Sequence, residues 1–266
     1  MRTILALLCL SAGIAAAQTK PTHENAAPES YPVWWETNGV LHLTKLEDAA
    51  ASFAEPFSKD DLDWLQAPPY LYHGPPMPAV HNCKELLESV DPNDYHSPKR
   101  VWAWGMIGSR CAELRELAHA VPARRSAVRN SVWTAAVFSL LPAGIYAASG
   151  DEHRRAAVEA GNKGLSLRQF WEQLEGSKDW QENWKRVPIS HDFYSGQVYV
   201  SLGADDPGFT DGYGIVARGD FDGDGWEDIM IEAIWSVRGS PANRYSVYVL
   251  TRKSEDGRFK MVRQVF

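Results

Sequence analysis

The stretch from Gly219 to Ile229 carries the most distinctive chemistry of the 266-residue chain, because its acidic residues recur at alternate positions. It reads Gly-Asp-Phe-Asp-Gly-Asp-Gly-Trp-Glu-Asp-Ile, with aspartates at loop positions 1, 3, 5 and 9 and glycine at position 6. Alternate spacing points successive carboxylates at one centre as the backbone curls, and Gly225 permits the positive φ of a sharp turn. Oxygen donors without His or Cys select Ca²⁺ over zinc or copper, and a flexible loop suits Ca²⁺ better than Mg²⁺. The predicted Ca²⁺ ligands are the carboxylates of Asp220, Asp222, Asp224 and Asp228 and the backbone carbonyl of Trp226.

The charge around this loop also favours a bound cation. From Asp205 to Glu232 there are nine acidic residues against the single Arg218, a net charge of −8 in 28 residues. A compact fold suffers from this repulsion unless a cation neutralises part of it. The alternative is an acidic turn that is solvated by water alone.

The loop is not an EF-hand, because Ile231 stands at position 12, where an EF-hand has a bidentate Glu. It resembles instead the calcium loop of FG-GAP and VCBS-type repeats, as in integrin β-propellers, whose pattern G-D-F-[DN]-G-D-G-x-x-D-[IL] matches Gly219 to Ile229 throughout. The resemblance implies that the same five residues hold Ca²⁺ in a turn between two strands. A propeller needs several such blades, and the motif occurs once. The resemblance therefore implies a blade-like, calcium-stabilised sheet rather than a propeller or an adhesion function.

Residues 1–17 have the pattern of a secretory signal peptide in an exported bacterial protein. Arg2 supplies the positive start, Thr3 to Leu10 the apolar stretch, and Ala15 to Ala17 the small residues before a cut at Gln18. A first transmembrane helix is the competing interpretation, but this apolar run is too short for a bilayer core of roughly 30 Å. We expect a periplasmic or secreted protein.

The cysteines fit this location. Cleavage after residue 17 removes Cys9 and leaves Cys83 and Cys111, which an oxidising compartment would join in a disulfide. Two independently buried free thiols are the alternative.

A charge-free stretch from Asn130 to Gly150 has the length of a membrane span. Pro142 and Gly144 interrupt it, and the arginines on its N-terminal flank would lie outside, contrary to the positive-inside tendency. We therefore expect a buried helix that ends near Leu141, followed by a short second helix, and no membrane span after signal cleavage.

The order of the remaining elements predicts an α+β fold. Residues 18–100 are rich in Pro and Trp and weak in periodicity, so we expect loops and short helices there. Residues 101–187 have apolar residues at helical spacing, as in Leu114, Leu117 and Ala118, and a capping box at Ser166 and Gln169. Residues 188–266 contain β-branched and aromatic runs separated by turn residues. The prediction is a helical region followed by a C-terminal antiparallel β-meander that carries one calcium loop.

Composition excludes some functions and leaves two open. The net charge of −7 argues against nucleic-acid binding. The chain has no H-E-x-x-H, no G-x-S-x-G and no Gly-rich phosphate loop. The pairs Trp34–Trp35, Trp102 with Trp104, and Trp180 with Trp184 could form a glycan platform, but core packing is the better interpretation for most of them. Trp34–Trp35 is the first pair to test for glycan binding. We expect an exported protein with a structural Ca²⁺ that binds an unknown protein or glycan partner without catalysis, as an inhibitor or immunity-like protein does. The alternative is a periplasmic or secreted hydrolase acting on cell-wall or glycan substrates.

Overall fold

The computed structural model describes residues 30–37, 40–43, 46–66, 79–89, 102–128, 135–147, 151–175, 189–191, 198–202, 209–237 and 243–266. The expected signal peptide at residues 1–17 lies outside this part of the chain, as do Trp180 and Trp184.

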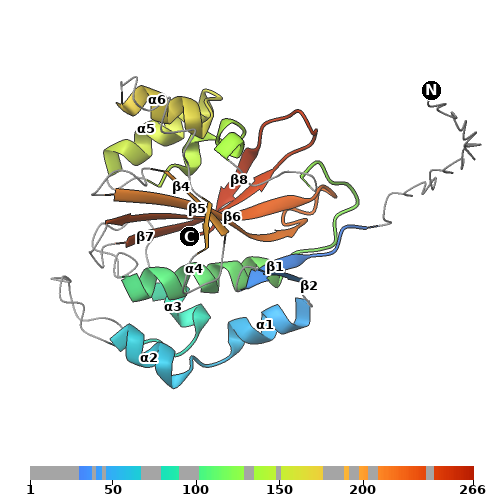
Figure 1. Cartoon of the computed structure of the whole chain (residues 1–266). Coiled ribbons are helices and arrows are strands. Elements are labelled where there is room, and N and C mark those ends of the chain that lie inside the picture. Colours follow the sequence, from blue (N-terminus) through green and yellow to red (C-terminus); the bar gives the residue numbers. More distant parts are fainter. Residues whose placement is uncertain are drawn as a thin grey trace, which may run out of the picture.

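One antiparallel sheet runs through the centre of the molecule (Figure 1). Its strands are β1 (Trp34–Thr37), β2 (Val40–Leu43), β3 (Ile189–His191), β4 (Val198–Leu202), β5 (Phe209–Gly219), β6 (Asp228–Val237), β7 (Asn243–Thr251) and β8 (Lys260–Gln264). The main order is β2-β1-β5-β6-β7-β8, and β4 also pairs with β5 and carries β3. Strands β4 to β8 pair in chain order and antiparallel, which confirms the predicted α+β class and C-terminal meander.

Helices lie on both faces of the sheet (Figure 1). They are α1 (Leu46–Ala54), α2 (Lys59–Gln66), α3 (Cys83–Ser89), α4 (Trp102–Leu117), the 3₁₀ helices η2 (Ala135–Ser139) and η3 (Ala143–Ile145), α5 (Asp151–Asn162) and α6 (Leu167–Glu175). Buried residues of α1 to α4 share one core with the sheet, and residues of η2, η3 and α6 share a second core with its other face. The sheet is therefore covered on both sides.

The sequence of strand β6 is largely apolar because the strand contributes side chains to the cores on both faces of the sheet. Ile229 and Ile231 pack into the core beside η2, η3 and α6, whereas Met230 packs into the core beside α4. Successive side chains of a strand point to opposite faces, so a strand buried on both faces needs an apolar residue at nearly every position.

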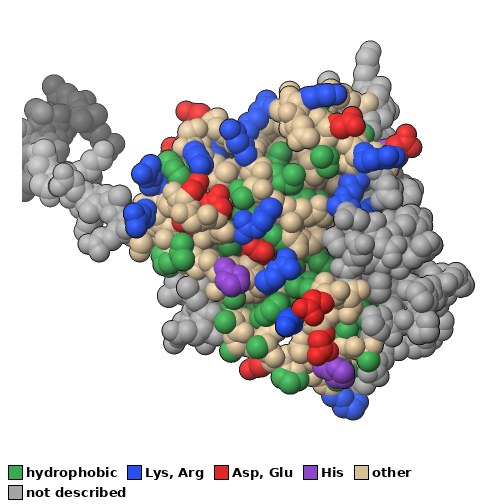
Figure 2. Space-filling view, turned by 180° about the vertical axis from the view of Figure 1, so that it is seen from behind, with side chains coloured by type: hydrophobic (Ala, Val, Ile, Leu, Met, Phe, Trp, Pro, Cys, Tyr) green, Lys and Arg blue, Asp and Glu red, His purple; other side chains and the backbone are tan. Residues whose placement is uncertain are grey.

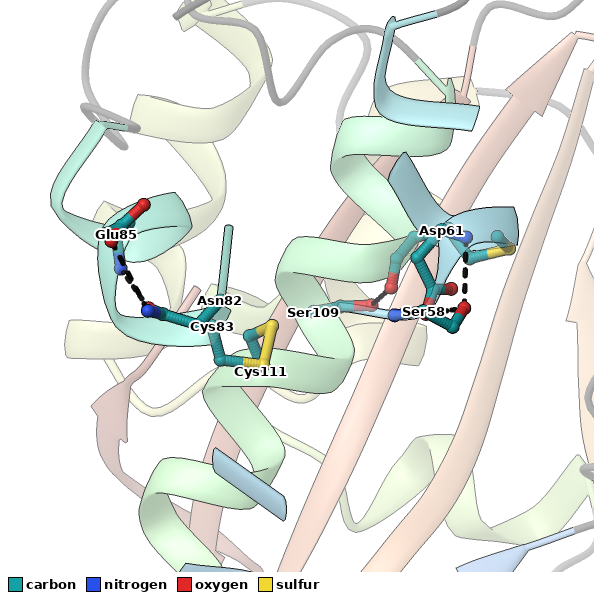
Figure 3. The surroundings of a disulfide bond; sticks show 8 residues. Ser58, Asp61, Asn82, Cys83, Glu85, Ser109 and Cys111 are labelled. Atoms are coloured by element: carbon teal, nitrogen blue, oxygen red, sulfur yellow. Dashed lines mark hydrogen bonds between the residues drawn. A yellow bond between two sulfur atoms is a disulfide. The ribbon is translucent and has the colours of Figure 1, made fainter. Parts of the chain in front are cut away.

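Short side-chain caps begin several helices. The predicted box at α6 is confirmed, because Gln169 N–H donates to Ser166 Oγ at 3.2 Å and Ser166 N–H donates to Gln169 Oε1 at 3.0 Å. Figure 3 shows two further caps, at α2 and α3. Asp61 N–H donates to Ser58 Oγ at 3.1 Å, and Glu85 N–H donates to Asn82 Oδ1 at 2.9 Å.

The N-terminal region contains the expected short helices but also a β-hairpin that the sequence analysis missed. Strands β1 and β2 pair antiparallel, and Trp34 and Trp35 of β1 pair with β5. The Arg110 guanidinium of α4 lies 3.7 Å from the centroid of the Trp35 ring and 2.9 Å from Glu113 Oε2. Trp35 is thus a packing residue that joins the hairpin to α4.

The described part of the charge-free stretch, residues 135–147, contains two short 3₁₀ helices. η2 ends two residues before Leu141 and η3 follows Pro142, near the expected helix end and second helix. Pro142 has no N–H to continue a helical hydrogen-bond ladder, and it restricts the residue before it. No helix in the described ranges is long and apolar enough to cross a membrane.

The predicted disulfide is present between Cys83 at the start of α3 and Cys111 in α4, with the two Cα atoms 5.0 Å apart (Figure 3). Both cysteines are buried in the core beside α4. The bond holds α3, which has only seven residues and would not persist alone, against the longer helix.

We expect the protein beginning at Gln18 to show no free thiol when it is unfolded without reductant. Replacing both cysteines by Ala should lower the free energy of unfolding by about 3 kcal/mol, because the bond closes a loop of 28 residues. A thiol assay and urea unfolding measure the two effects. Two reactive thiols in the intact protein would contradict the bond.

A second prediction concerns the close approach of α4 to the chain end. A Cβ added at Gly108 would lie 2.6 Å from Cζ of Phe266, whose ring is buried. Gly108→Ala should therefore destabilise the protein by about 1–3 kcal/mol, although Ala favours helices. In the background of Phe266→Ala the same change should cost little, and a double-mutant cycle by urea unfolding tests this coupling. Equal costs in both backgrounds would show that the two residues do not interact.

Candidate metal centre

The acidic loop connects β5 to β6 and begins where the two strands stop pairing. Gly219 pairs with Asp228, and the chain between them turns through Asp220 to Glu227. Side-chain oxygens of three residues, Asp220, Asp222 and Asp224, all lie within 4.8 Å of one another. The structure thus brings three of the predicted ligands together in one group that could hold a metal ion.

Asp220 organises the turn from its centre. It is buried, and its two carboxylate oxygens accept hydrogen bonds from the N–H groups of Gly223 at 2.7 Å and Gly225 at 2.8 Å. Both glycines have positive φ, 80° and 84°. The expectation for Gly225 is confirmed, because a left-handed backbone there turns its N–H toward the first aspartate.

Asp222 and Asp224 follow the same local rule. Asp222 Oδ1 accepts from the N–H of Asp224 at 3.1 Å, and Asp224 Oδ1 accepts from the N–H of Trp226 at 2.8 Å. Each side chain is held by a backbone group two residues later, as in an Asx turn. One oxygen of each carboxylate, Oδ1, therefore orients its side chain.

Asp228 is the most buried of the predicted ligands, with no exposed surface. Its Oδ2 accepts from the N–H of Phe221 at 3.1 Å, whereas its buried Oδ1 has no hydrogen-bond partner. Burial raises the pKa of Asp228 to about 7, and the charges of Asp222 and Asp224 add to this effect. The Thr251 side chain and the Phe221 N–H favour the charged carboxylate and so lower the pKa, but burial outweighs them. A buried carboxylate oxygen without a hydrogen bond is costly. Asp228 is not part of the group formed by the other three aspartates.

Trp226 is the one predicted ligand that would bind the ion through its backbone carbonyl rather than through a side chain. Its carbonyl accepts no hydrogen bond from a described residue. Its ring lies 5.4 Å from the guanidinium of Arg125. The backbone oxygen is thus available as a ligand, and the side chain packs against the segment that follows α4.

Lys253, just beyond β7, lies beside the loop. Its Nζ is 2.5 Å from Asp224 Oδ2. Burial works against ionisation of Asp224, but the hydrogen bond and charge of Lys253 outweigh it, so the pKa of Asp224 is lowered. The same contact raises the pKa of Lys253. No sequence pattern marked this lysine, because the contact joins two different hairpins.

The loop is also fixed to the helical half of the molecule, which the sequence analysis did not foresee. Asp220 and Val121 exchange backbone hydrogen bonds of 3.0 and 2.9 Å. The Gly225 carbonyl accepts from the N–H groups of Arg124 and Arg125 at 2.9 and 3.0 Å. The segment 121–126 therefore lies along the loop like an additional strand.

Side chains reinforce this contact. Ser126 Oγ donates to Glu227 Oε2, and Arg263 of β8 donates both to Glu116 of α4 and to the Phe221 carbonyl, the latter at 2.9 Å. The segment 121–126 also pairs with the N-terminal chain, since Ala123 and Tyr31 exchange hydrogen bonds of 2.9 and 2.7 Å. The loop thus lies where three parts of the chain meet.

The described surface offers no second obvious site. Figure 2 shows basic and acidic side chains interspersed on one face, with hydrophobic side chains only in small groups. Among the described residues, Val121 and Met261 are the large hydrophobic side chains that are exposed. The acidic loop is therefore the feature on which a functional assignment depends.

Comparison of the chain with protein-family models, with curated proteins and with solved structures finds no match. Any assignment must therefore come from the loop itself.

The burial of Asp228 predicts a pH effect in the metal-free protein. A carboxyl whose pKa is raised by folding stabilises the fold when protonated, and this contribution is lost as the pH rises from about 4 through about 7. Asp228→Asn removes the titration. We measure the free energy of unfolding in urea with EGTA. Relative to the wild type, the variant should become more stable by about 1 kcal/mol or more when the pH is raised from 5 to 8. A stability difference that is the same at both pH values would contradict the burial of this charge.

Proposed function

We propose that the β5–β6 loop binds one Ca²⁺ ion with a structural role. The observation that carries the proposal is the grouping of the Asp220, Asp222 and Asp224 oxygens within 4.8 Å of one another. Asp228, at the end of the same loop, has a buried oxygen without a hydrogen-bond partner. The available donors are oxygens, which hard cations prefer, and Trp226 adds a carbonyl.

The FG-GAP and VCBS-type resemblance supports the same assignment. Its pattern runs from Gly219 to Ile229, across a turn between two antiparallel strands, and it implies the same five ligands. In this proposal Asp220, Asp222, Asp224 and Asp228 supply side-chain oxygens and Trp226 supplies its backbone carbonyl.

The ion would act on more than one hairpin. By neutralising the clustered carboxylates it would stabilise the loop, and the loop backbone carries the hydrogen bonds to the segment 121–126. Calcium would therefore hold the sheet and the helical half together.

We further propose that the protein is exported and acts by binding rather than by catalysis. The disulfide and the expected signal peptide fit an oxidising, calcium-rich compartment. The chain has no H-E-x-x-H, no G-x-S-x-G and no Gly-rich phosphate loop, which argues against the common metal-dependent and nucleophilic hydrolases. A protein or glycan partner, of the inhibitor or immunity-like kind, fits such a rigid protein. Its capture by the mature protein in calcium but not in EGTA would identify it.

Calcium should raise the thermal stability of the wild type. At 1 mM Ca²⁺ and a Kd near 10 μM, binding to the folded state alone adds roughly 2.7 kcal/mol to the free energy of unfolding. Asp222→Ala should lose most of this gain, because it removes a ligand that is exposed and not needed by the core. Calorimetry in EGTA, Ca²⁺ and Mg²⁺ measures the effect and the ion preference.

Asp256→Ala is the matched control, since Asp256 is an exposed aspartate in the turn between β7 and β8. It should respond to Ca²⁺ as the wild type does. Hydrogen exchange should show the metal-dependent protection in both 220–228 and 121–126. Identical melting of the wild type with EGTA and with Ca²⁺ would disprove the site and leave an acidic turn solvated by water.

A further inference from the structure

A lysine from a different hairpin already contacts one of the proposed ligands. Lys253 lies two residues beyond the end of β7, and its ammonium is 2.5 Å from Asp224 Oδ2. The side chain is 58% exposed, so it is held by this contact rather than by packing. An ammonium at a carboxylate oxygen occupies the position that a metal ion would use.

Asp224 has no spare oxygen in this arrangement. Its Oδ1 accepts the N–H of Trp226 at 2.8 Å, and its Oδ2 faces Lys253. Asp222, in contrast, makes one described hydrogen bond, through Oδ1. A cation that uses Asp224 must therefore displace the ammonium or share an oxygen with it.

A second observation indicates that the loop takes a ligand beyond this lysine. Asp228 is fully buried, and its Oδ1 is unpaired even though Lys253 lies beside the loop. The contact of Lys253 with Asp224 thus leaves the buried Oδ1 of Asp228 without a hydrogen bond.

We infer that Lys253 sets the affinity of the loop for its divalent cation by competing with the ion for Asp224. This inference rests on the proposed calcium site. When the ion binds, the long exposed side chain moves its charge into solvent, which a buried lysine could not do. The competition tunes the site to a compartment in which calcium is abundant.

The test is calorimetric titration of EGTA-treated, desalted full-length mature protein with Ca²⁺. Lys253→Met keeps the side-chain length and removes the charge, so we expect roughly three- to tenfold tighter binding at low salt. Lys253→Arg keeps the charge and should bind within about twofold of the wild type. Lys163→Met is the matched control, because Lys163 is an exposed lysine at the end of α5 and its loss changes the net charge equally.

The melting temperature separates this role from a merely structural one. Lys253→Met should melt lower than the wild type in EGTA, since the carboxylates lose a counter-ion, but the difference should shrink or reverse in saturating Ca²⁺. Equal or weaker Ca²⁺ binding by Lys253→Met, with binding by the wild type intact, would overturn this inference alone. Absence of Ca²⁺ binding in both proteins would overturn the proposed site as well.

Discussion

Repulsion among carboxylates at the β5–β6 turn is the constraint to which the surrounding structure responds. The turn gathers side-chain oxygens of Asp220, Asp222 and Asp224 within 4.8 Å of one another, and the buried Asp228 ends the loop. Backbone N–H groups, a lysine from another hairpin and the segment after α4 all contact this group or the loop that carries it. The N–H groups and the lysine place positive charge against the carboxylates, whereas Asp228 Oδ1 accepts none of these hydrogen bonds. The three aspartates are therefore a group that could hold a metal ion.

The sheet supplies the rigid frame that such a loop needs. Strands β5 and β6 are buried on both faces by helices, so their ends are fixed by two cores rather than one. A loop that joins two well-packed strands loses little conformational freedom when it binds an ion, because its ends are already positioned. Arg263 extends this frame by linking β8, α4 and the Phe221 carbonyl.

Local signals predicted more of this structure than distant ones. The meander, the Ser166 cap, the disulfide and the grouping of aspartates each depend on residues close in sequence or on a single possible pairing. The β1–β2 hairpin carried such a signal as well, since Asn38-Gly39 separates two apolar runs and favours a two-residue turn, but the Pro-rich surroundings obscured it. The contact of Lys253 with Asp224 and the pairing of 121–126 with the loop join distant segments. Only the packed fold decides such contacts, so no sequence pattern indicated them.

The contacts of residues 121–126 have a thermodynamic consequence. Ala123 pairs with Tyr31, while Val121, Arg124 and Arg125 make backbone hydrogen bonds to the loop. The N-terminal chain and the loop are therefore neighbours through one intermediate segment, and the free energy of ordering that segment is common to both. Linkage is reciprocal, so at the proposed calcium site whatever displaces Tyr31 from the segment would weaken ion binding by the same factor by which the ion would tighten the attachment of Tyr31.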